Sequence, residues 1–150
     1  MRLALYEPDI PPNAGAMMRL AAVMGVGVDL IEPAGFVLSD RRLRRAGLDY
    51  LDTVRLTRHR SWAAFQGARS DGRLVLLTTA AETVYTTFAF RDSDILLVGR
   101  ETAGVPAKVH AAADARVRVP MVAGLRSLNV ALAAAMVLGE ALRQTESWPE

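Results

Sequence analysis

The stretch that decides the fold class is DILLVGRETAGVP, from Asp94 to Pro106. Its four consecutive apolar residues, ILLV, show no polar alternation, which is typical of a strand that a parallel sheet buries on both faces. Gly99, Glu101 and Gly104 follow, beyond the expected carboxyl end of this strand. Open α/β sheets bind their ligands at that edge, so part of a site is expected here. Taken alone, the stretch also fits an ordinary loop with a solvated glutamate.

Similar apolar runs and helical patterns continue in both directions along the chain. Further strands are predicted at 3–6, 27–31, 73–79 and 117–120. Apolar residues with the spacing of one helix face run from Met17 to Met24, and Gly25 is a typical stop. A longer helix is predicted from Ser127 to about Gln144. We therefore expect an α/β fold with a mostly parallel sheet and helices on both faces, as a single domain over all 150 residues.

The composition excludes several classes of protein. The chain has no cysteine and two histidines, which rules out a disulfide scaffold and gives no reason to expect a metal site. We expect His59 and His110 to be surface or capping residues. The longest apolar run, Val130 to Leu138, has nine residues, about half of the ~18 needed for a membrane span. The N-terminal apolar run is too short for a secretory signal, so a cytoplasmic protein is expected.

Positive charge is concentrated between Asp40 and Arg60. Seven arginines and three aspartates lie there, whereas the formal net charge of the whole chain is only +2. Arginine binds phosphate in a bidentate manner, so a basic segment on a neutral background favours contact with a nucleic-acid backbone. The arginines assigned to RNA on this basis are Arg41, Arg42, Arg44, Arg45, Arg58 and Arg60. A solvated helix face without a partner is the simpler alternative.

The turn YEPDIPPNAGAMMRL, from Tyr6 to Leu20, joins the first strand to the first helix. Asn13 is predicted to cap this helix, and the two prolines before it would hold the entry rigid. A dinucleotide-binding turn is the obvious rival, because Glu32 lies where a ribose-binding acid would be expected. That rival fails since the turn lacks three glycines at fixed offsets, and no GxxxxGK[ST] phosphate loop is present either.

The stretch VRVPMVAGLRSLNVALAA, residues 117–134, predicts a strand, a loop and the start of the last helix. Ser127 would cap that helix, which makes Asn129 an unusual residue for its first turn. The first half of the helix is apolar nearly all round, more than one helix can hide in a small domain. A partner subunit is therefore expected to cover it.

Four stretches together resemble the motifs of the SPOUT superfamily of RNA methyltransferases, in its 2′-O-ribose branch. They are YEPDIPPNAGAMMRL, IEPAGF with RRLRRAGLDY, GRETAGVP and VPMVAGLRSLNVALA. The resemblance extends to the group that methylates the wobble cytidine or uridine of leucine tRNAs, and it covers residues 1 to about 144. It implies S-adenosylmethionine as cofactor, a homodimer whose active sites are completed across the interface, and a C-terminal deep trefoil knot, which general rules of topology disfavour.

The resemblance also implies roles for particular residues. The catalytic positions are Arg19, Asn13, Glu101, Ser127 and Asn129, and the cofactor positions are Leu77, Gly99, Val119, Ser127 and Leu128. Arg19 is expected to anchor a phosphate and stabilise the developing alkoxide, because a guanidinium is effectively never deprotonated in proteins. Ala131 stands where the family often has a serine, so no second hydroxyl is expected there.

Three alternatives stay open from the sequence. The same chemistry could act on another RNA, such as ribosomal RNA. A catalytically silent, knotted RNA-binding protein would keep the fold without the reaction, although the intact catalytic positions argue against silence. A flavodoxin-like cofactor carrier is the most distant possibility.

Overall fold

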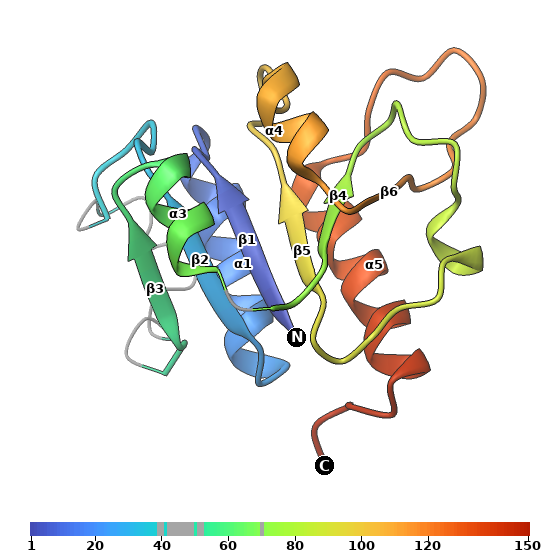
Figure 1. The fold of residues 1–150 in the computed structure, drawn as a ribbon, viewed down its shortest axis with the longest axis horizontal. Helices are drawn as coiled ribbons and strands as arrows, with labels where there is room; N and C mark the ends of the chain where they lie inside the picture. The colour runs from blue at the N-terminus through green and yellow to red at the C-terminus, as the bar shows by residue number, and fades with distance from the viewer. Residues whose placement is uncertain (39–40, 42–49, 51–52, 70) are drawn as a thin grey trace.

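A six-stranded sheet runs through the centre of the computed structural model, which describes residues 1–38, 41, 50, 53–69 and 71–150 (Figure 1). The strands are β1 (Arg2–Tyr6), β2 (Gly27–Ile31), β3 (Leu56–His59), β4 (Leu74–Leu77), β5 (Ile95–Val98) and β6 (Ala115–Val117). Their order is β3-β2-β1-β5-β4-β6, and each adjacent pair is parallel. The prediction of a mostly parallel α/β sheet is therefore confirmed.

Helices cover both faces of this sheet. They are α1 (Pro11–Val23), α3 (Trp62–Ala68), α4 (Ala107–Ala112) and α5 (Val130–Gln144), with a short 3-10 helix, η2 (Tyr85–Thr87), before β5. Helices α1 and α5 lie behind the sheet in Figure 1, and α3 and α4 lie in front of it. Met17 of α1 and Leu138 of α5 are buried in one core, whereas Phe65 of α3 and Val109 of α4 are buried in a second core on the opposite face. Burial on both faces explains the unbroken apolar runs of β1 and β5.

The sequence does not predict β3, which lies at the end of the basic segment. Thr57 and Arg58 in this strand are exposed, so the strand carries no apolar run that could identify it. It forms because its backbone pairs with β2 along one edge of the sheet. The predicted strand at 117–120 is also displaced, since β6 ends at Val117, level with the end of β4 at Leu77.

His59 is buried, so the expectation of a surface or capping histidine is wrong. Its Nε2 lies 2.8 Å from Oδ1 of Asp29, and Arg2 donates from Nε to Oδ2 of the same carboxylate at 2.6 Å. The ring also packs edge-on against Phe65, with 5.2 Å between centroids. This cluster joins β1, β2 and β3 and supplies the polar partners that a buried imidazole requires.

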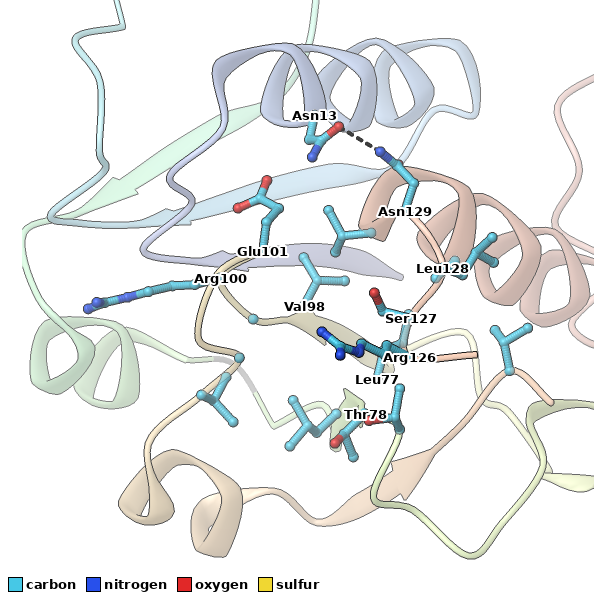
Figure 2. Close-up of a pocket in the computed structure, with 18 of the residues that line it drawn as sticks. Asn13, Leu77, Thr78, Val98, Arg100, Glu101, Arg126, Ser127, Leu128 and Asn129 are labelled. Carbon is cyan, nitrogen blue, oxygen red and sulfur yellow. Dashed lines mark hydrogen bonds between the residues drawn. The ribbon is translucent and has the colours of Figure 1, made fainter. Parts of the chain in front are cut away.

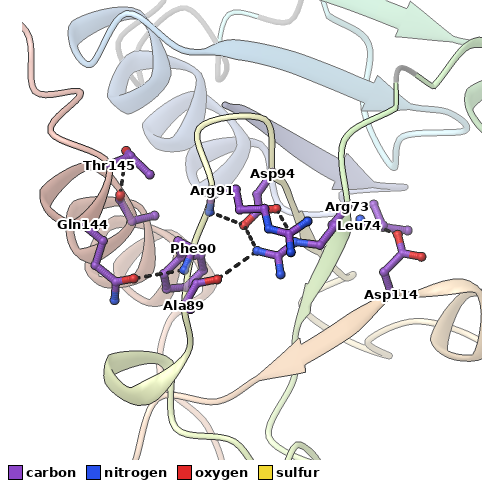
Figure 3. Close-up of polar contacts among 10 residues, drawn as sticks. Arg73, Leu74, Ala89, Phe90, Arg91, Asp94, Asp114, Gln144 and Thr145 are labelled. Carbon is purple, nitrogen blue, oxygen red and sulfur yellow. Dashed lines mark hydrogen bonds and ion pairs between the residues drawn. The ribbon is translucent and has the colours of Figure 1, made fainter.

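A second buried carboxylate, Asp94, fixes the start of β5 (Figure 3). Arg73 donates from Nε and from a terminal nitrogen to its two oxygens, both at 2.8 Å, and the backbone N–H of Arg91 donates a third bond at 2.8 Å. Hydrogen bonding to Asp94 raises the pKa of Arg73. The pair therefore links the start of β4 to the turn before β5.

We expect Arg73→Met to lower the free energy of unfolding by about 3 kcal/mol, because it leaves the fully buried Asp94 carboxylate without its cationic partner. Urea denaturation at neutral pH measures the change. Arg91→Met is the matched control, since Arg91 is exposed and contacts Asp94 through its backbone, and it should stay within about 0.5 kcal/mol of the parent. Equal stability of the two variants would contradict the assigned role.

Within the described ranges, no helix combines the length and the apolar character needed to cross a bilayer. The trefoil knot and the single-domain organisation stay predictions.

Candidate active site

A cavity of about 450 Å³ opens at the carboxyl ends of β4, β5 and β6 (Figure 2). The loops that follow these strands form its walls, together with the beginnings of α1 and α5. The order of the strands reverses beside it, between β1 and β5. Strands β2 and β3 lie on one side of β1, and strands β5, β4 and β6 lie on the other side. Ligands of open α/β sheets bind at such a switch point.

All of the predicted cofactor positions line this cavity: Leu77, Gly99, Val119, Ser127 and Leu128. They come from the ends of β4 and β5, from the stretch after β6 and from the loop before α5. Val98 and Thr78 line the cavity as well, so its lining combines apolar side chains with hydroxyl groups (Figure 2). A cavity of this size and lining fits a small organic ligand.

A tight turn after β5 brings the backbone to the edge of the cavity. Arg100 and Gly104 exchange two backbone hydrogen bonds, of 3.0 and 2.9 Å, and Gly104 has a positive φ of 62°. A Cβ atom on Gly99 would lie 2.7 Å from the carbonyl carbon of Gly104. Glycine at position 99 therefore lets two backbone segments touch beside the cavity.

Glu101 enters the cavity from this turn and is held by Asp9 from the loop after β1. The backbone N–H of Asp9 donates to Oε2 of Glu101 at 3.2 Å, and the backbone N–H of Glu101 donates to Oδ1 of Asp9 at 3.1 Å. Burial, and then hydrogen bonding with Asp9, raises the pKa of Glu101. Hydrogen bonding with Glu101 lowers the pKa of Asp9. The two shifts have opposite directions, so Asp9 loses its proton at lower pH than Glu101 does.

The beginnings of α1 and α5 meet through two asparagines on the rim of the cavity. Nδ2 of Asn129 donates to Oδ1 of Asn13 at 2.9 Å (Figure 2). Oδ1 of Asn129 accepts from the backbone N–H groups of Ala131 and Leu132, which makes Asn129, and not Ser127, the cap of α5. The prediction that Ser127 caps the helix and that Asn129 lies in its first turn is therefore wrong. The Ser127 side chain has no capping role.

Asn13 does not cap α1, contrary to the prediction. The helix begins at Pro11, with Ile10 in the capping position and no side-chain cap. Prolines in the first turn have no N–H to satisfy, so a capping side chain gains little there. Asn13 lies inside this first turn and bonds Asn129 instead.

We expect Asn129→Ala to lower the free energy of unfolding by about 1 kcal/mol, since α5 loses its cap. Asn129→Ser should recover most of this stability because serine also caps helices, but it cannot restore the bond to Asn13. Thermal unfolding, and the methyl transfer that the family resemblance implies, separate the two roles when both are measured on each variant. Full activity in the serine variant would show that the contact between the asparagines is dispensable.

Arg19 is the one predicted catalytic residue that does not line the cavity in this chain. It is exposed on α1, and its guanidinium carbon lies 5.1 Å from the ring centroid of Tyr50. Asn13, Glu101, Ser127 and Asn129 all line the cavity. One chain therefore brings together every predicted catalytic residue except the arginine.

The predicted RNA-binding arginines are only partly described. Arg41, Arg58 and Arg60 are exposed, and Arg58 forms an ion pair with Glu32. This ion pair gives Glu32, at the end of β2, a structural role in place of the ribose-binding role that a dinucleotide-binding turn would require. Arg42, Arg44 and Arg45 lie outside the described residues.

The sequence prediction of the site omits several charged residues near it, among them Arg126 and Asp9. Arg126 is exposed and lines the cavity just before Ser127. Asp9 contacts Glu101 from a position 92 residues earlier in the chain. The position of Arg126 beside a motif serine could have indicated it, but no local pattern connects Asp9 to Glu101.

Comparison with known proteins places the chain in a family. Residues 1–139 match the SpoU rRNA Methylase family. The chain belongs to this methylase family. A tRNA (cytidine(34)-2′-O)-methyltransferase of Beijerinckia indica subsp. indica is 62% identical over 144 residues, which are 95% of this chain and 90% of the relative. The resemblance to SPOUT RNA methyltransferases is thereby confirmed.

Solved structures agree with the SpoU assignment. A structure determined for the 2-OH methylation of C/U34 on tRNA superimposes with a TM-score of 0.91 at 42% identity, covering 95% of this chain and 94% of that chain. The SpoU methyltransferase AviRb from Streptomyces viridochromogenes, in complex with the cofactor AdoMet, has a TM-score of 0.85 at 28% identity, covering 96% of this chain and 60% of that chain. No three potential metal ligands lie together in the described part of the SpoU chain.

Proposed function

We propose that this SpoU-family chain is an S-adenosylmethionine-dependent 2′-O-ribose methyltransferase that acts in the cytoplasm on the wobble cytidine or uridine of leucine tRNAs. The observation that carries the proposal is the cavity at the switch point of the sheet. Its lining includes every predicted cofactor position and every predicted catalytic position except Arg19. The tRNA methyltransferase named above, at 62% identity, supports the choice of substrate.

The cavity fits the cofactor in size and in chemical character. Leu77, Val119 and Leu128 provide apolar surface, and the close backbone approach at Gly99 leaves peptide groups at the edge of the cavity. When bound, S-adenosylmethionine supplies an electrophilic methyl group on a sulfonium centre. Because Asn129 caps α5, the Ser127 hydroxyl is available to bind the cofactor or the ribose.

The polar residues on the rim have distinct roles in this proposal. Asn13 and Asn129, joined at 2.9 Å, keep the beginnings of α1 and α5 in register beside the ribose. Arg19 provides a permanent positive charge that anchors the adjacent phosphate and stabilises the oxygen as negative charge develops on it. Arg41, Arg58 and Arg60, with the basic residues around them, contact the tRNA backbone.

A homodimer would supply the missing arginine. Leu132 and Met136 of α5 are 57% and 43% exposed, and Val23 of α1 is 50% exposed. Helices α1 and α5 pack against each other on one face of the sheet, so these side chains support an apolar contact with a second subunit. We infer that this contact carries Arg19 of one subunit to the cavity of the other. The proposal also includes a trefoil knot in the C-terminal third of the chain, as the family resemblance implies.

Transfer of labelled methyl groups from S-adenosylmethionine to purified RNA tests the proposed function. We expect label in tRNA from a host that lacks the wobble methylation, and no label in tRNA that already carries it. Label in ribosomal RNA alone would contradict the proposed tRNA substrate but would support the proposed methyl-transfer reaction. Binding of S-adenosylmethionine to the protein without transfer to either RNA would favour the silent RNA-binding protein.

A further inference from the structure

Asp9 and Glu101 hydrogen-bond each other's backbone, and one carboxyl oxygen of the pair has no hydrogen-bond partner among the described residues. Oε2 of Glu101 accepts the backbone N–H of Asp9, Oδ1 of Asp9 accepts the backbone N–H of Glu101, and Oδ2 of Asp9 accepts the hydroxyl of Thr102. The remaining oxygen, Oε1 of Glu101, is buried and has no hydrogen-bond partner among the residues that the structure describes. Three of the four carboxyl oxygens are thus used for positioning.

Leaving a buried carboxyl oxygen without a partner is unfavourable, so its occurrence at a cavity wall needs an explanation. Glu101 lines the cavity in which the reacting ribose is proposed to bind. In Figure 2 its carboxyl group lies on the side of the cavity where Asn13 is, between α1 and the end of β5. A hydroxyl proton from a ligand would satisfy the oxygen in this position.

The other charged side chains around the cavity form no ion pair with Glu101 in the described part of the chain. Arg100, its neighbour in the turn, forms an ion pair with Glu7 and points away from Glu101 in Figure 2. Arg126, from the loop before α5, lies near Leu77 on another wall. Helices α1 and α5 contribute uncharged asparagines at this point. Asp9 is therefore the described charged group that holds Glu101.

We propose that Glu101 accepts the proton of the ribose 2′-hydroxyl during methyl transfer, and that Asp9 is the positioning residue that aims and tunes it. This inference rests on the proposed function. The proton passes from the 2′-oxygen to Oε1 of Glu101, and an electron pair of the 2′-oxygen forms the new bond to the methyl carbon. The electrons of the former carbon–sulfur bond remain on sulfur, which loses its positive charge. Arg19 then stabilises charge on the oxygen without exchanging a proton.

The direction of the pKa shift sets the pH dependence. A raised pKa makes Glu101 a stronger proton acceptor than an exposed glutamate, and it also keeps the side chain protonated further up the pH scale. The transfer rate should therefore rise with pH as Glu101 loses its proton, with an apparent pKa above 4.5, the ordinary value for this group. Burial raises this pKa most and Asp9 raises it further, so Asp9→Asn should move the rising limb to lower pH without removing the effect of burial.

Single-turnover methyl transfer, measured across the acidic range, tests the assignment. We expect Glu101→Gln to lower the rate by about 10²–10³-fold and to abolish the rising limb. Asp9→Asn keeps the shape of the side chain and should shift the limb to lower pH with a smaller loss of rate. Asp92→Asn, on an exposed aspartate, is the control and should leave the profile unchanged. An unshifted limb in Asp9→Asn, or a limb that persists in Glu101→Gln, would overturn the proposal.

A carboxyl titration by NMR, on protein labelled with ¹³C at the glutamate carboxyl carbon, provides a readout without catalysis. The resonance that disappears in Glu101→Gln should titrate above the ordinary range and should move down in Asp9→Asn. An ordinary titration in the parent protein would refute the tuning by Asp9 even if methylation occurs. A raised titration without methyl transfer to any RNA would instead refute the proposed function and, with it, the role of Glu101 as proton acceptor.

Discussion

Arg19→Ala should lower the single-turnover rate of methyl transfer by about 10²–10³-fold while leaving the fold intact. This is the loss expected when one preorganised charge is removed from a developing oxyanion. Arg19 is exposed and packs over Tyr50, so its removal should change the free energy of unfolding by less than about 1 kcal/mol. Arg19→Lys keeps the charge but not the planar guanidinium, so its single-turnover rate should lie between those of the parent and of Arg19→Ala.

The pH profile of the lysine variant distinguishes charge stabilisation from proton transfer by Arg19. If Arg19 acts only through its charge, the profiles of the parent and the lysine variant should have the same shape. A titration that belongs to Arg19 and vanishes in Arg19→Lys would contradict this role.

Mixing variants tests whether Arg19 acts across the dimer interface. Arg19→Ala and Glu101→Gln subunits, each nearly inactive alone, should form mixed dimers with one intact site, because each lacks a different half. Random exchange should restore about a quarter of the parent activity. No recovery, in mixtures shown by mass to contain mixed dimers, would mean that one chain provides both residues.

Gly99→Ala should lower kcat/KM by about 10²-fold and weaken the binding of S-adenosylmethionine. The added Cβ would lie 2.7 Å from the carbonyl carbon and 3.0 Å from Cα of Gly104, and neither backbone atom can turn aside as a side chain can. The loop must move, which strains the two backbone hydrogen bonds between Arg100 and Gly104. Displacements near 1 Å at a reacting centre have effects of this size.

Gly67→Ala is the matched control for this prediction. Gly67 lies in α3, and a Cβ atom there would meet nothing within 4 Å. Alanine should support the helix better than glycine, by up to about 1 kcal/mol, and leave methyl transfer unchanged. Calorimetry with S-adenosylmethionine and initial rates on both variants make the comparison, and normal cofactor binding by Gly99→Ala would show that the turn can relax.

The sheet was predictable where apolar runs mark buried strands. Ile95 to Val98 of β5 are fully buried, and the same run gives the position of the cavity, because ligands bind past the carboxyl ends of parallel strands. Strand β3 was not predictable, since its exposed Thr57 and Arg58 give no such run. His59 was misjudged for a related reason: its partner, Asp29, lies on a neighbouring strand 30 residues away.

Most of the predicted residues line one cavity, but the sequence did not predict how they are arranged. Motif resemblance identified Asn13, Ser127 and Asn129, yet it could not show that Asn129 caps α5 and bonds Asn13 at the same time. The contact between Asp9 and Glu101 spans 92 residues and depends on the adjacency of β1 and β5. Such pairings follow from strand order, which local patterns in a sequence do not encode.

Mapping the methylated nucleotide tests the central claim most directly. Leucine tRNA from a host lacking the wobble modification would be incubated with the protein and S-adenosylmethionine, digested with nuclease and analysed by mass spectrometry. The proposed function predicts one added methyl group, on the 2′-oxygen of the wobble cytidine or uridine. A methyl group on a base, or on a ribose elsewhere in the tRNA, would contradict it.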